Sequence, residues 1–191
     1  MRTLVFIFSL IAISLVSYSQ KERALIIIDI QDFYFPGGDA ELVNPEEAAG
    51  NAFRVLEYFR ENDEPVVHVR HNYEPGGNIH QAVAPGEGEK VISKDYANSF
   101  RDTGLLEHLR KNNIKELIIA GMQTHMCVEA TTRAAADKGF RCTVISDACT
   151  TRDLNYGDKV INWEDVHYST LSTLKGGYAT IMTASEFIEA Y

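Results

Sequence analysis

The chain has 191 residues, of which 45% are hydrophobic and 24% charged, and its formal net charge is -9. These values are those of an ordinary globular protein with one hydrophobic core, and the sequence shows no internal repeat or long linker that would indicate a second domain. The negative charge argues against nucleic acid or an anionic membrane surface as the main partner, because both require a basic face.

Residues 1–19 are predicted to be a secretory signal peptide. Arg2 precedes an apolar run over 4–16 that is short for a membrane span, and the small residues Ser17 and Ser19 stand like the last residues before a cleavage site. An uncleaved anchor or a buried helix is the alternative, but a first core strand starting by Ala24 would leave almost no tether. We therefore expect a single mature domain over 20–191, located in the periplasm or outside the cell, with no membrane contact after cleavage.

Strand-like and helix-like segments alternate along the rest of the chain. Short apolar or β-branched runs predict strands over 24–29, 65–70, 90–94, 115–121, 141–148 and 178–183. Amphipathic stretches predict helices over 44–62, 103–113, 124–140, 164–177 and 184–191. This alternation is typical of an α/β fold, here a doubly wound, mainly parallel six-stranded sheet with helices on both faces. Ligands of such sheets bind beyond the carboxyl ends of the strands, so polar residues at those ends are the candidates for chemistry.

The chain has three cysteines, and an odd number in an oxidising compartment leaves at least one free thiol. Cys142 and Cys149 bracket one predicted strand, and seven extended residues separate them by roughly 20 Å, too far for a disulfide unless the strand bends back. At least one thiol is therefore kept free.

Three residues follow or end different predicted strands: Asp29, Lys94 and Cys127. Taken singly, each has an ordinary structural interpretation, as a helix cap or hydrogen-bond acceptor, a surface charge and an inert core thiol respectively. Taken together, their types are complementary. A helix N-terminus and an ammonium group stabilise a thiolate, and a carboxylate can take the thiol proton and later give it to a leaving amine.

The chain resembles the isochorismatase-like superfamily of cysteine hydrolases, which includes nicotinamidases and N-carbamoylsarcosine amidases. The matching segments are ALIIIDIQDFYFPGG, VISKDYANSF, IIAGMQTHMCVEATTRAAADKGF and VISDACTTRD, in the family's order. The resemblance implies a catalytic triad of Asp29, Lys94 and Cys127, a cis peptide at Met122–Gln123, and an oxyanion hole formed by the N–H groups of Gln123 and Cys127. It also implies hydrolysis of a C–N bond in a small amide, carbamoyl or ureido compound through a thioester.

Two departures from the family bear on these expectations. Family members commonly have a small residue at the position of Gln123, so the glutamine is expected to reshape the pocket. Nicotinamidases hold a metal with an Asp-x-His pattern, which is absent after the second predicted strand. His68 alternates with valines like a packed strand residue, and His71 and His80 are a weak pair with no clear third ligand. We therefore predict no metal and no cofactor.

The sequence also offers candidate pocket residues around the expected site. Phe35, Tyr96 and Phe100 lie on loops beside it and are candidates to line a substrate pocket, with ordinary loop packing as the alternative. Gln31 is placed either to bind a polar group of the substrate or to cap the next helix. The sequence does not decide whether His125 points into the site.

A rival function is that of a thiol redox or peroxide-reactive protein, in which Cys149 would resolve an oxidised Cys127. That function would leave Asp29 and Lys94 unexplained. A binding protein that has lost turnover is a further alternative, against which the intact triad argues. The expected partners are a small amide-type molecule and, because family members are often dimers or tetramers, further copies of the chain.

Overall fold

A computed structural model describes residues 22–191. The predicted signal peptide over 1–19 lies outside the described residues. Among residues 22–191, no helix combines the length and the apolar character needed to cross a membrane.

The centre of the protein is a six-stranded sheet in the order β3-β2-β1-β4-β5-β8, and every neighbouring pair is parallel. Its strands are β1 (Arg23–Ile28), β2 (Val66–His71), β3 (Lys90–Lys94), β4 (Glu116–Met122), β5 (Arg141–Thr150) and β8 (Thr180–Met182). In β1 five consecutive residues are buried, as a central parallel strand covered on both faces requires. The predicted doubly wound parallel sheet is confirmed.

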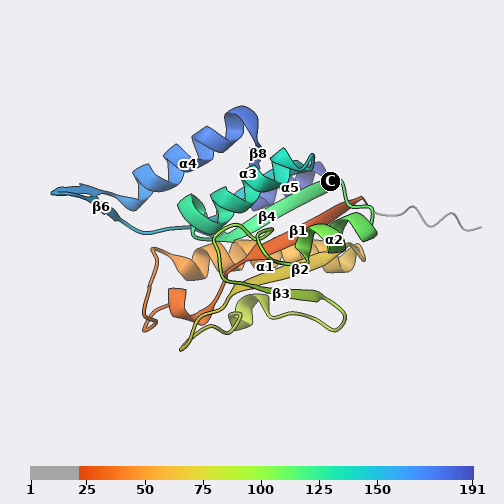
Figure 1. Ribbon diagram of the computed structural model, residues 1–191, viewed down its shortest axis with the longest axis horizontal. Helices are drawn as coiled ribbons and strands as arrows, with labels where there is room; N and C mark the ends of the chain where they lie inside the picture. Colours follow the sequence, from red (N-terminus) through yellow and green to blue (C-terminus); the bar gives the residue numbers. More distant parts are fainter. Residues whose placement is uncertain (1–21) are drawn as a thin grey trace, which may run out of the picture.

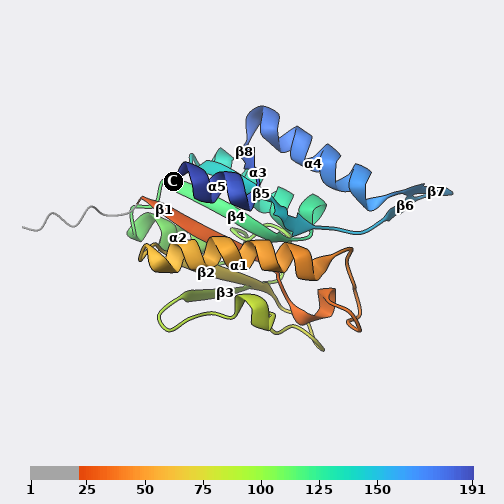
Figure 2. The ribbon, with the colours of Figure 1, turned by 180° about the vertical axis from the view of Figure 1, so that it is seen from behind.

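Helices cover both faces of the sheet (Figures 1 and 2). They are α1 (Pro45–Glu61), α2 (Leu105–Lys111), α3 (Glu129–Asp137), α4 (Trp163–Gly177) and α5 (Ala184–Ala190). Alternate residues of β1 belong to different cores: Leu25 and Ile27 pack with α1 and α5, whereas Ile26 and Ile28 pack with α2, α3 and α4. The two-residue period of a strand thus sorts one apolar run into two cores.

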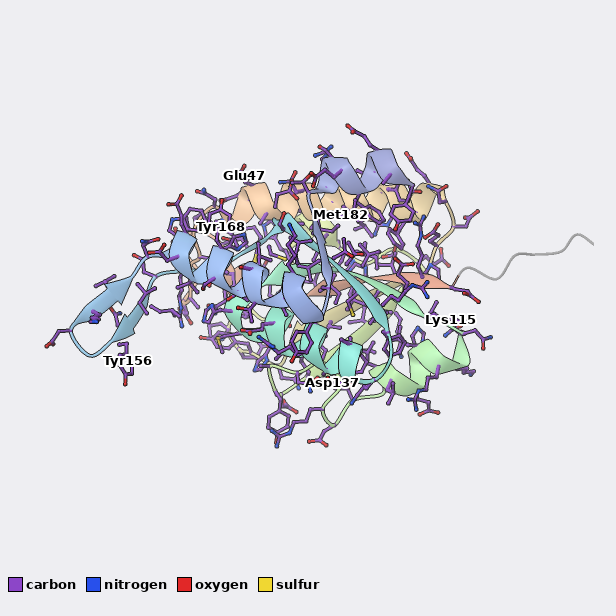
Figure 3. The ribbon with its side chains drawn as sticks, turned by 90° about the horizontal axis from the view of Figure 1, so that it is seen from above. Glu47, Lys115, Asp137, Tyr156, Tyr168 and Met182 are labelled. Carbon is purple, nitrogen blue, oxygen red and sulfur yellow. The ribbon has the colours of Figure 1, made fainter. Side chains whose placement is uncertain are left out.

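The structure differs from the prediction after the fifth strand of the sheet. A two-stranded antiparallel hairpin, formed by β6 (Leu154–Tyr156) and β7 (Lys159–Ile161), projects from the body, with Tyr156 on the hairpin (Figures 1 and 3). Gly157 in its turn has φ +59°, a conformation that glycine adopts readily. Strands of three residues fall below the length at which a periodic pattern is visible, so this hairpin was not predicted.

The predicted helix over 124–140 has two parts. Thr124–Val128 form a π-helical turn, and α3 continues from Glu129. Single π-helical turns are frequent at functional sites, and this one carries Cys127.

In the sheet, β2 and β3 follow on one side of β1, and the chain then crosses to β4, which lies on the other side of β1. This reversal of strand order is a topological switch point, where doubly wound folds bind their ligands. The two central strands lie very close there. A Cβ atom at Gly121 of β4, whose φ is +142°, would stand 2.0 Å from the carbonyl oxygen of Ile28 in β1.

Candidate active site

Asp29, Lys94 and Cys127 meet at the carboxyl ends of β1, β3 and β4. The Lys94 ammonium donates to Asp29 Oδ2 at 2.7 Å and to Cys127 Sγ at 3.2 Å. Asp29 is 0%, Lys94 1% and Cys127 5% exposed, so the cluster is closed off from bulk water. The structure therefore brings together the three residues that the sequence singled out.

The backbone of Asp29 is left-handed, with φ +50°. Its N–H donates to the carbonyl of Val69 in β2 at 2.9 Å. A non-glycine residue in this conformation costs about 1 kcal/mol or more, and such residues concentrate at functional sites.

Burial sets the protonation of the cluster. Burial and, to a lesser extent, the charge of Asp29 raise the pKa of the Cys127 thiol to about 12, against the lowering effect of Lys94. Burial also raises the pKa of Asp29, against the lowering effect of Lys94. Asp29 Oδ1 has no hydrogen-bond partner among residues 22–191. The site thus places a thiol beside a buried carboxyl group, one oxygen of which is free to accept a proton.

His71, the last residue of β2, is the third neighbour of the Lys94 ammonium, with Nδ1 at 3.3 Å from Nζ. Gln31 holds it in place: Gln31 Oε1 accepts from the His71 N–H at 2.7 Å, and Gln31 Nε2 donates to the carbonyls of His71 and Gly77 at 2.9 and 2.7 Å. An ammonium group has three N–H donors, and here each of them has one acceptor.

The ligand atoms of Asp29, His71 and Cys127 lie within 4.8 Å of one another, close enough to bind a metal ion. However, the same three residues surround the Lys94 ammonium, whose positive charge stands where a cation would bind. These residues therefore do not fit a metal site. His80 is elsewhere: its Nδ1 accepts from the N–H of Ala82 at 3.3 Å.

The peptide bond between Met122 and Gln123 is cis, as the resemblance implies. Gln123 opens the π-helical turn, and its carbonyl accepts from the N–H groups of Met126 and Val128 at 3.1 and 3.3 Å. Gln123 Nε2 donates to the hydroxyl of Tyr34 at 3.2 Å.

Of the aromatic residues predicted to line a pocket, none donates or accepts a hydrogen bond in the cluster. Phe35 stacks on His80, with ring centroids 3.6 Å apart. Tyr96 is 40% exposed, and the Arg101 guanidinium lies over its ring.

Phe100 packs in the core, which was the alternative to a pocket role. Its ring stacks on Phe140 at 6.1 Å, and Phe140 directly precedes β5, at the opposite end of α3 from Cys127. The Lys138 ammonium lies 5.7 Å from the centre of the Phe100 ring, at that same end of α3. Gln31 is 0% exposed, and its amide makes three hydrogen bonds to the main chain, which use both of its N–H donors.

Tyr34 and His71 were not predicted from the sequence as neighbours of the cluster. Tyr34 lies on a short 3-10 turn (Asp32–Tyr34) after β1, and His71 was considered only as a metal ligand. His71 could have been predicted there, because it ends β2, the strand next to β1 in the sheet.

His125 is directed to Thr151, whose hydroxyl lies 2.6 Å from His125 Nδ1. His68 is 1% exposed, which confirms it as a packed strand residue.

All three cysteines of the described chain are free. Burial raises the pKa of Cys142 and of Cys149 to about 12. Cys149 lines a cleft of about 150 Å³ between the starts of α1 and α4, where Glu47 and Tyr168 also contribute (Figure 3). None of the residues lining this cleft belongs to the Asp29–Lys94–Cys127 cluster.

Comparison with known proteins gives a consistent result. The family described as isochorismatase domain matches residues 23–185. The isochorismatase family protein YddQ of Bacillus subtilis is 43% identical over 177 residues, which cover 87% of this chain and 98% of that protein. A crystal structure from Oleispira antarctica superposes with a TM-score of 0.85 at 41% identity, covering 88% of this chain and 96% of that one.

More distant relatives include proteins named for reactions. Streptothricin hydrolase of Streptomyces noursei is 31% identical over 69% of this chain and 56% of that protein. Nicotinamidase 3 of Arabidopsis thaliana and maleamate amidohydrolase of Pseudomonas putida are each 25% identical, over 86% and 91% of this chain and 86% and 88% of those proteins. The secreted isochorismatase effector Isc1 of Verticillium dahliae is 34% identical over 71% of this chain and 76% of that protein.

Proposed function

The chain belongs to the isochorismatase family, and from this premise we propose that it is a hydrolase of C–N bonds in small amide, carbamoyl or ureido compounds, with Cys127 as nucleophile. One observation carries the proposal: a buried thiol lies 3.2 Å from an ammonium that also binds a buried carboxylate. The names of three relatives, a nicotinamidase, a maleamate amidohydrolase and a streptothricin hydrolase, support the class of reaction.

In the proposed reaction, Asp29 takes the proton of the Cys127 thiol while the thiolate attacks the carbonyl carbon. Because the free thiol has a pKa of about 12, proton transfer has to accompany attack, and the adjacent Lys94 ammonium stabilises the developing charges. The N–H groups of Gln123 and Cys127 are proposed to bind the oxyanion.

The second half of the reaction uses the same groups. Asp29 gives its proton to the leaving nitrogen, the C–N bond breaks, and the acyl group remains on Cys127 as a thioester. Asp29 then takes a proton from water, the hydroxide attacks the thioester carbonyl, and the carboxylic acid leaves as the thiol is protonated again. Protons balance over the cycle, and no redox step or cofactor is required.

The test is ammonia release from a panel of small primary amides and N-carbamoyl compounds. Wild type is expected to release ammonia from at least one of them, and Cys127→Ala to release it at least about a thousandfold more slowly. Cys142→Ala is the matched control, because it removes an equally buried thiol distant from Lys94, and it should retain wild-type turnover. Full turnover by Cys127→Ala would refute the proposal.

The rival redox function is disfavoured by the surroundings of Cys149, its resolving thiol. Burial raises the pKa of Cys149 to about 12, and Cys149 lines a cleft to which no residue of the Asp29–Lys94–Cys127 cluster contributes. A peroxide-consumption assay on wild type and Cys149→Ala separates the two functions, since only the redox function predicts a loss in Cys149→Ala.

We also propose that the protein is exported, with cleavage after residue 19 and the domain over 20–191 as the mature form. The apolar run and small residues at its end support this, and one relative is named as secreted. Sequencing the N-terminus of protein recovered from periplasm or medium tests it. A chain that begins at Met1 and stays inside the cell would contradict it.

Self-association is proposed as well. The β6–β7 hairpin exposes apolar side chains, with Tyr156 80% and Val160 68% exposed (Figure 3), and burying them between copies would be favourable. Light scattering after size exclusion should give a dimer or tetramer for wild type, and a smaller species for the double variant Tyr156→Ser, Val160→Ser. A monomeric wild type would refute self-association.

A further inference from the structure

Two polar side chains beside the cluster, Tyr34 and Gln123, form a hydrogen-bonded pair that is only partly satisfied. Both are buried, at 7% and 4% exposed. Gln123 Nε2 donates to the Tyr34 hydroxyl at 3.2 Å, whereas Gln123 Oε1 has no partner in the part of the chain that the structure describes. A buried acceptor without a donor is destabilising, so such a group is expected to meet a ligand or water.

The pair has donors and an acceptor left over. Because the Tyr34 oxygen accepts from Gln123, its own O–H and the second N–H of Gln123 Nε2 are free to donate, and Gln123 Oε1 is free to accept. Burial raises the pKa of Tyr34, so the hydroxyl keeps its proton. Turning the Gln123 amide by 180° would make Tyr34 the donor within the pair. The unused groups would then be the two amide N–H groups and the tyrosine oxygen, again donors together with an acceptor.

The pair borders the reacting atoms. Gln123 follows the cis peptide and opens the turn that carries Cys127, and its main-chain N–H is the proposed oxyanion donor. Tyr34 stands on the turn that begins three residues after Asp29, and its hydroxyl is hydrogen-bonded to the Gln123 amide. A substrate held by Cys127 is therefore expected to lie next to the pair.

We propose that Tyr34 and Gln123 bind a second, uncharged amide or ureido group of the substrate, next to the carbonyl that Cys127 attacks. A planar amide presents an N–H donor and a C=O acceptor side by side, which matches an unused acceptor beside unused donors. A carboxylate or a ketone has only acceptors and would leave the unused acceptor of the pair, Gln123 Oε1 or the Tyr34 oxygen, without a donor. This inference rests on the proposed function and adds the substrate class: diamides and acylated or carbamoylated amides.

The test compares isosteric pairs of ligands in which a carboxamide is replaced by an isopropyl group of the same shape. The pairs are malonamide with 3-methylbutanamide, succinamide with 4-methylpentanamide, and glutaramide with 5-methylhexanamide. Their dissociation constants are measured calorimetrically on the full-length Cys127→Ala variant, which does not depend on turnover. At least one diamide is expected to bind about tenfold or more tightly than its isostere, as for one or two net hydrogen bonds.

Adding Tyr34→Phe or Gln123→Met to Cys127→Ala should reduce that preference to about twofold or less. Tyr58→Phe is the matched control, because the Tyr58 hydroxyl also accepts a side-chain hydrogen bond, from Arg23 at 3.1 Å at the other end of β1, and it should keep the full preference. Equal binding within all three pairs would overturn the inference, and so would a preference that survives in both double variants. A hydroxylated ligand bound as tightly as the diamide would overturn the assignment to an amide.

Failure of this inference and failure of the proposed function give different results. If wild type releases ammonia through Cys127 but the ligand preference is absent, the pair has only a structural role and the proposed function stands. If the preference is present and depends on Tyr34, while Cys127→Ala turns over as fast as wild type, the binding site stands and the nucleophile is wrong.

Discussion

Replacing Lys94 with methionine tests the buried ion pair most severely. The substitution keeps an unbranched apolar side chain of similar length and removes only the ammonium. The lysine is 1% exposed and its Nζ is 2.7 Å from Asp29 Oδ2. At an effective dielectric constant of about 20, two charges at that separation attract by about 6 kcal/mol, much of which offsets the cost of taking both out of water.

Lys94→Met leaves Asp29 as an uncompensated buried charge. Breaking one side of a buried pair typically costs about 3–5 kcal/mol, so the free energy of unfolding at pH 7 should fall by that amount. The double variant Asp29→Asn, Lys94→Met removes both charges and should recover part of the loss. Lys90→Met, at the exposed start of the same strand, is the control and should change stability by less than about 0.5 kcal/mol.

The loss in Lys94→Met should depend on pH with a definite sign. Burial already raises the pKa of Asp29, and removing Lys94 takes away the main opposing effect. A carboxyl group whose pKa is higher in the folded state binds a proton there first, so stability falls as pH rises above its unfolded pKa of about 4. Urea unfolding should therefore show a smaller deficit at pH 5 than at pH 8. A loss below about 1 kcal/mol, with no pH dependence, would refute a buried Asp29–Lys94 ion pair.

Three further changes have definite outcomes. His71→Leu removes one of three acceptors around the Lys94 ammonium and should lower kcat/KM about tenfold, whereas His71→Gln, which retains an acceptor, should lose less. Burial would raise the pKa of Glu89, but hydrogen bonds from Arg60, the Gly86 N–H and His68 outweigh it and hold the pKa at about 2. The Tm of wild type should therefore fall as the pH is lowered from 4.5 to 2, and the Tm of Glu89→Gln should fall less steeply over the same range. Gly121→Ala would place a Cβ 2.0 Å from the Ile28 oxygen and should destabilise the fold by more than about 2 kcal/mol.

Each of these outcomes has a clear opposite. Equal kcat/KM in His71→Leu and wild type would remove His71 from the support of Lys94. Parallel Tm curves for Glu89→Gln and wild type below pH 4.5 would show that Glu89 is not linked to acid stability. A Gly121→Ala protein as stable as wild type would contradict the close approach of β1 and β4.

The sequence could predict the cluster because strand ends are local features and a parallel sheet brings them together. Asp29, Lys94 and Cys127 are each recognisable beside an apolar run, and the fold class places the carboxyl ends of β1, β3 and β4 at one edge. Partners that depend on the path of a loop could not be predicted. Phe100 follows Lys94 closely in sequence, but the loop takes it to Phe140.

The Tyr34–Gln123 pair shows the same limit. The two residues are 89 positions apart, and neither occurs in a pattern that points to the other. Similarly, the sequence placed Gln31 either to bind a substrate or to cap the next helix, and neither alternative includes the main chain of His71 and Gly77, to which its amide is hydrogen-bonded. Whether a side-chain hydrogen bond forms between two loops depends on differences in distance of a few tenths of an ångström, which sequence patterns do not encode.

The identity of the nucleophile is tested most directly by acid-quenching the wild-type enzyme during turnover of an amide that it hydrolyses and mapping the modified peptide by mass spectrometry. The predicted result is an acyl group on the peptide that contains Cys127, removable by hydroxylamine as a thioester, with Cys142 and Cys149 unmodified. An acyl group on either of the other cysteines, or steady ammonia release with no acyl group on Cys127, would contradict it.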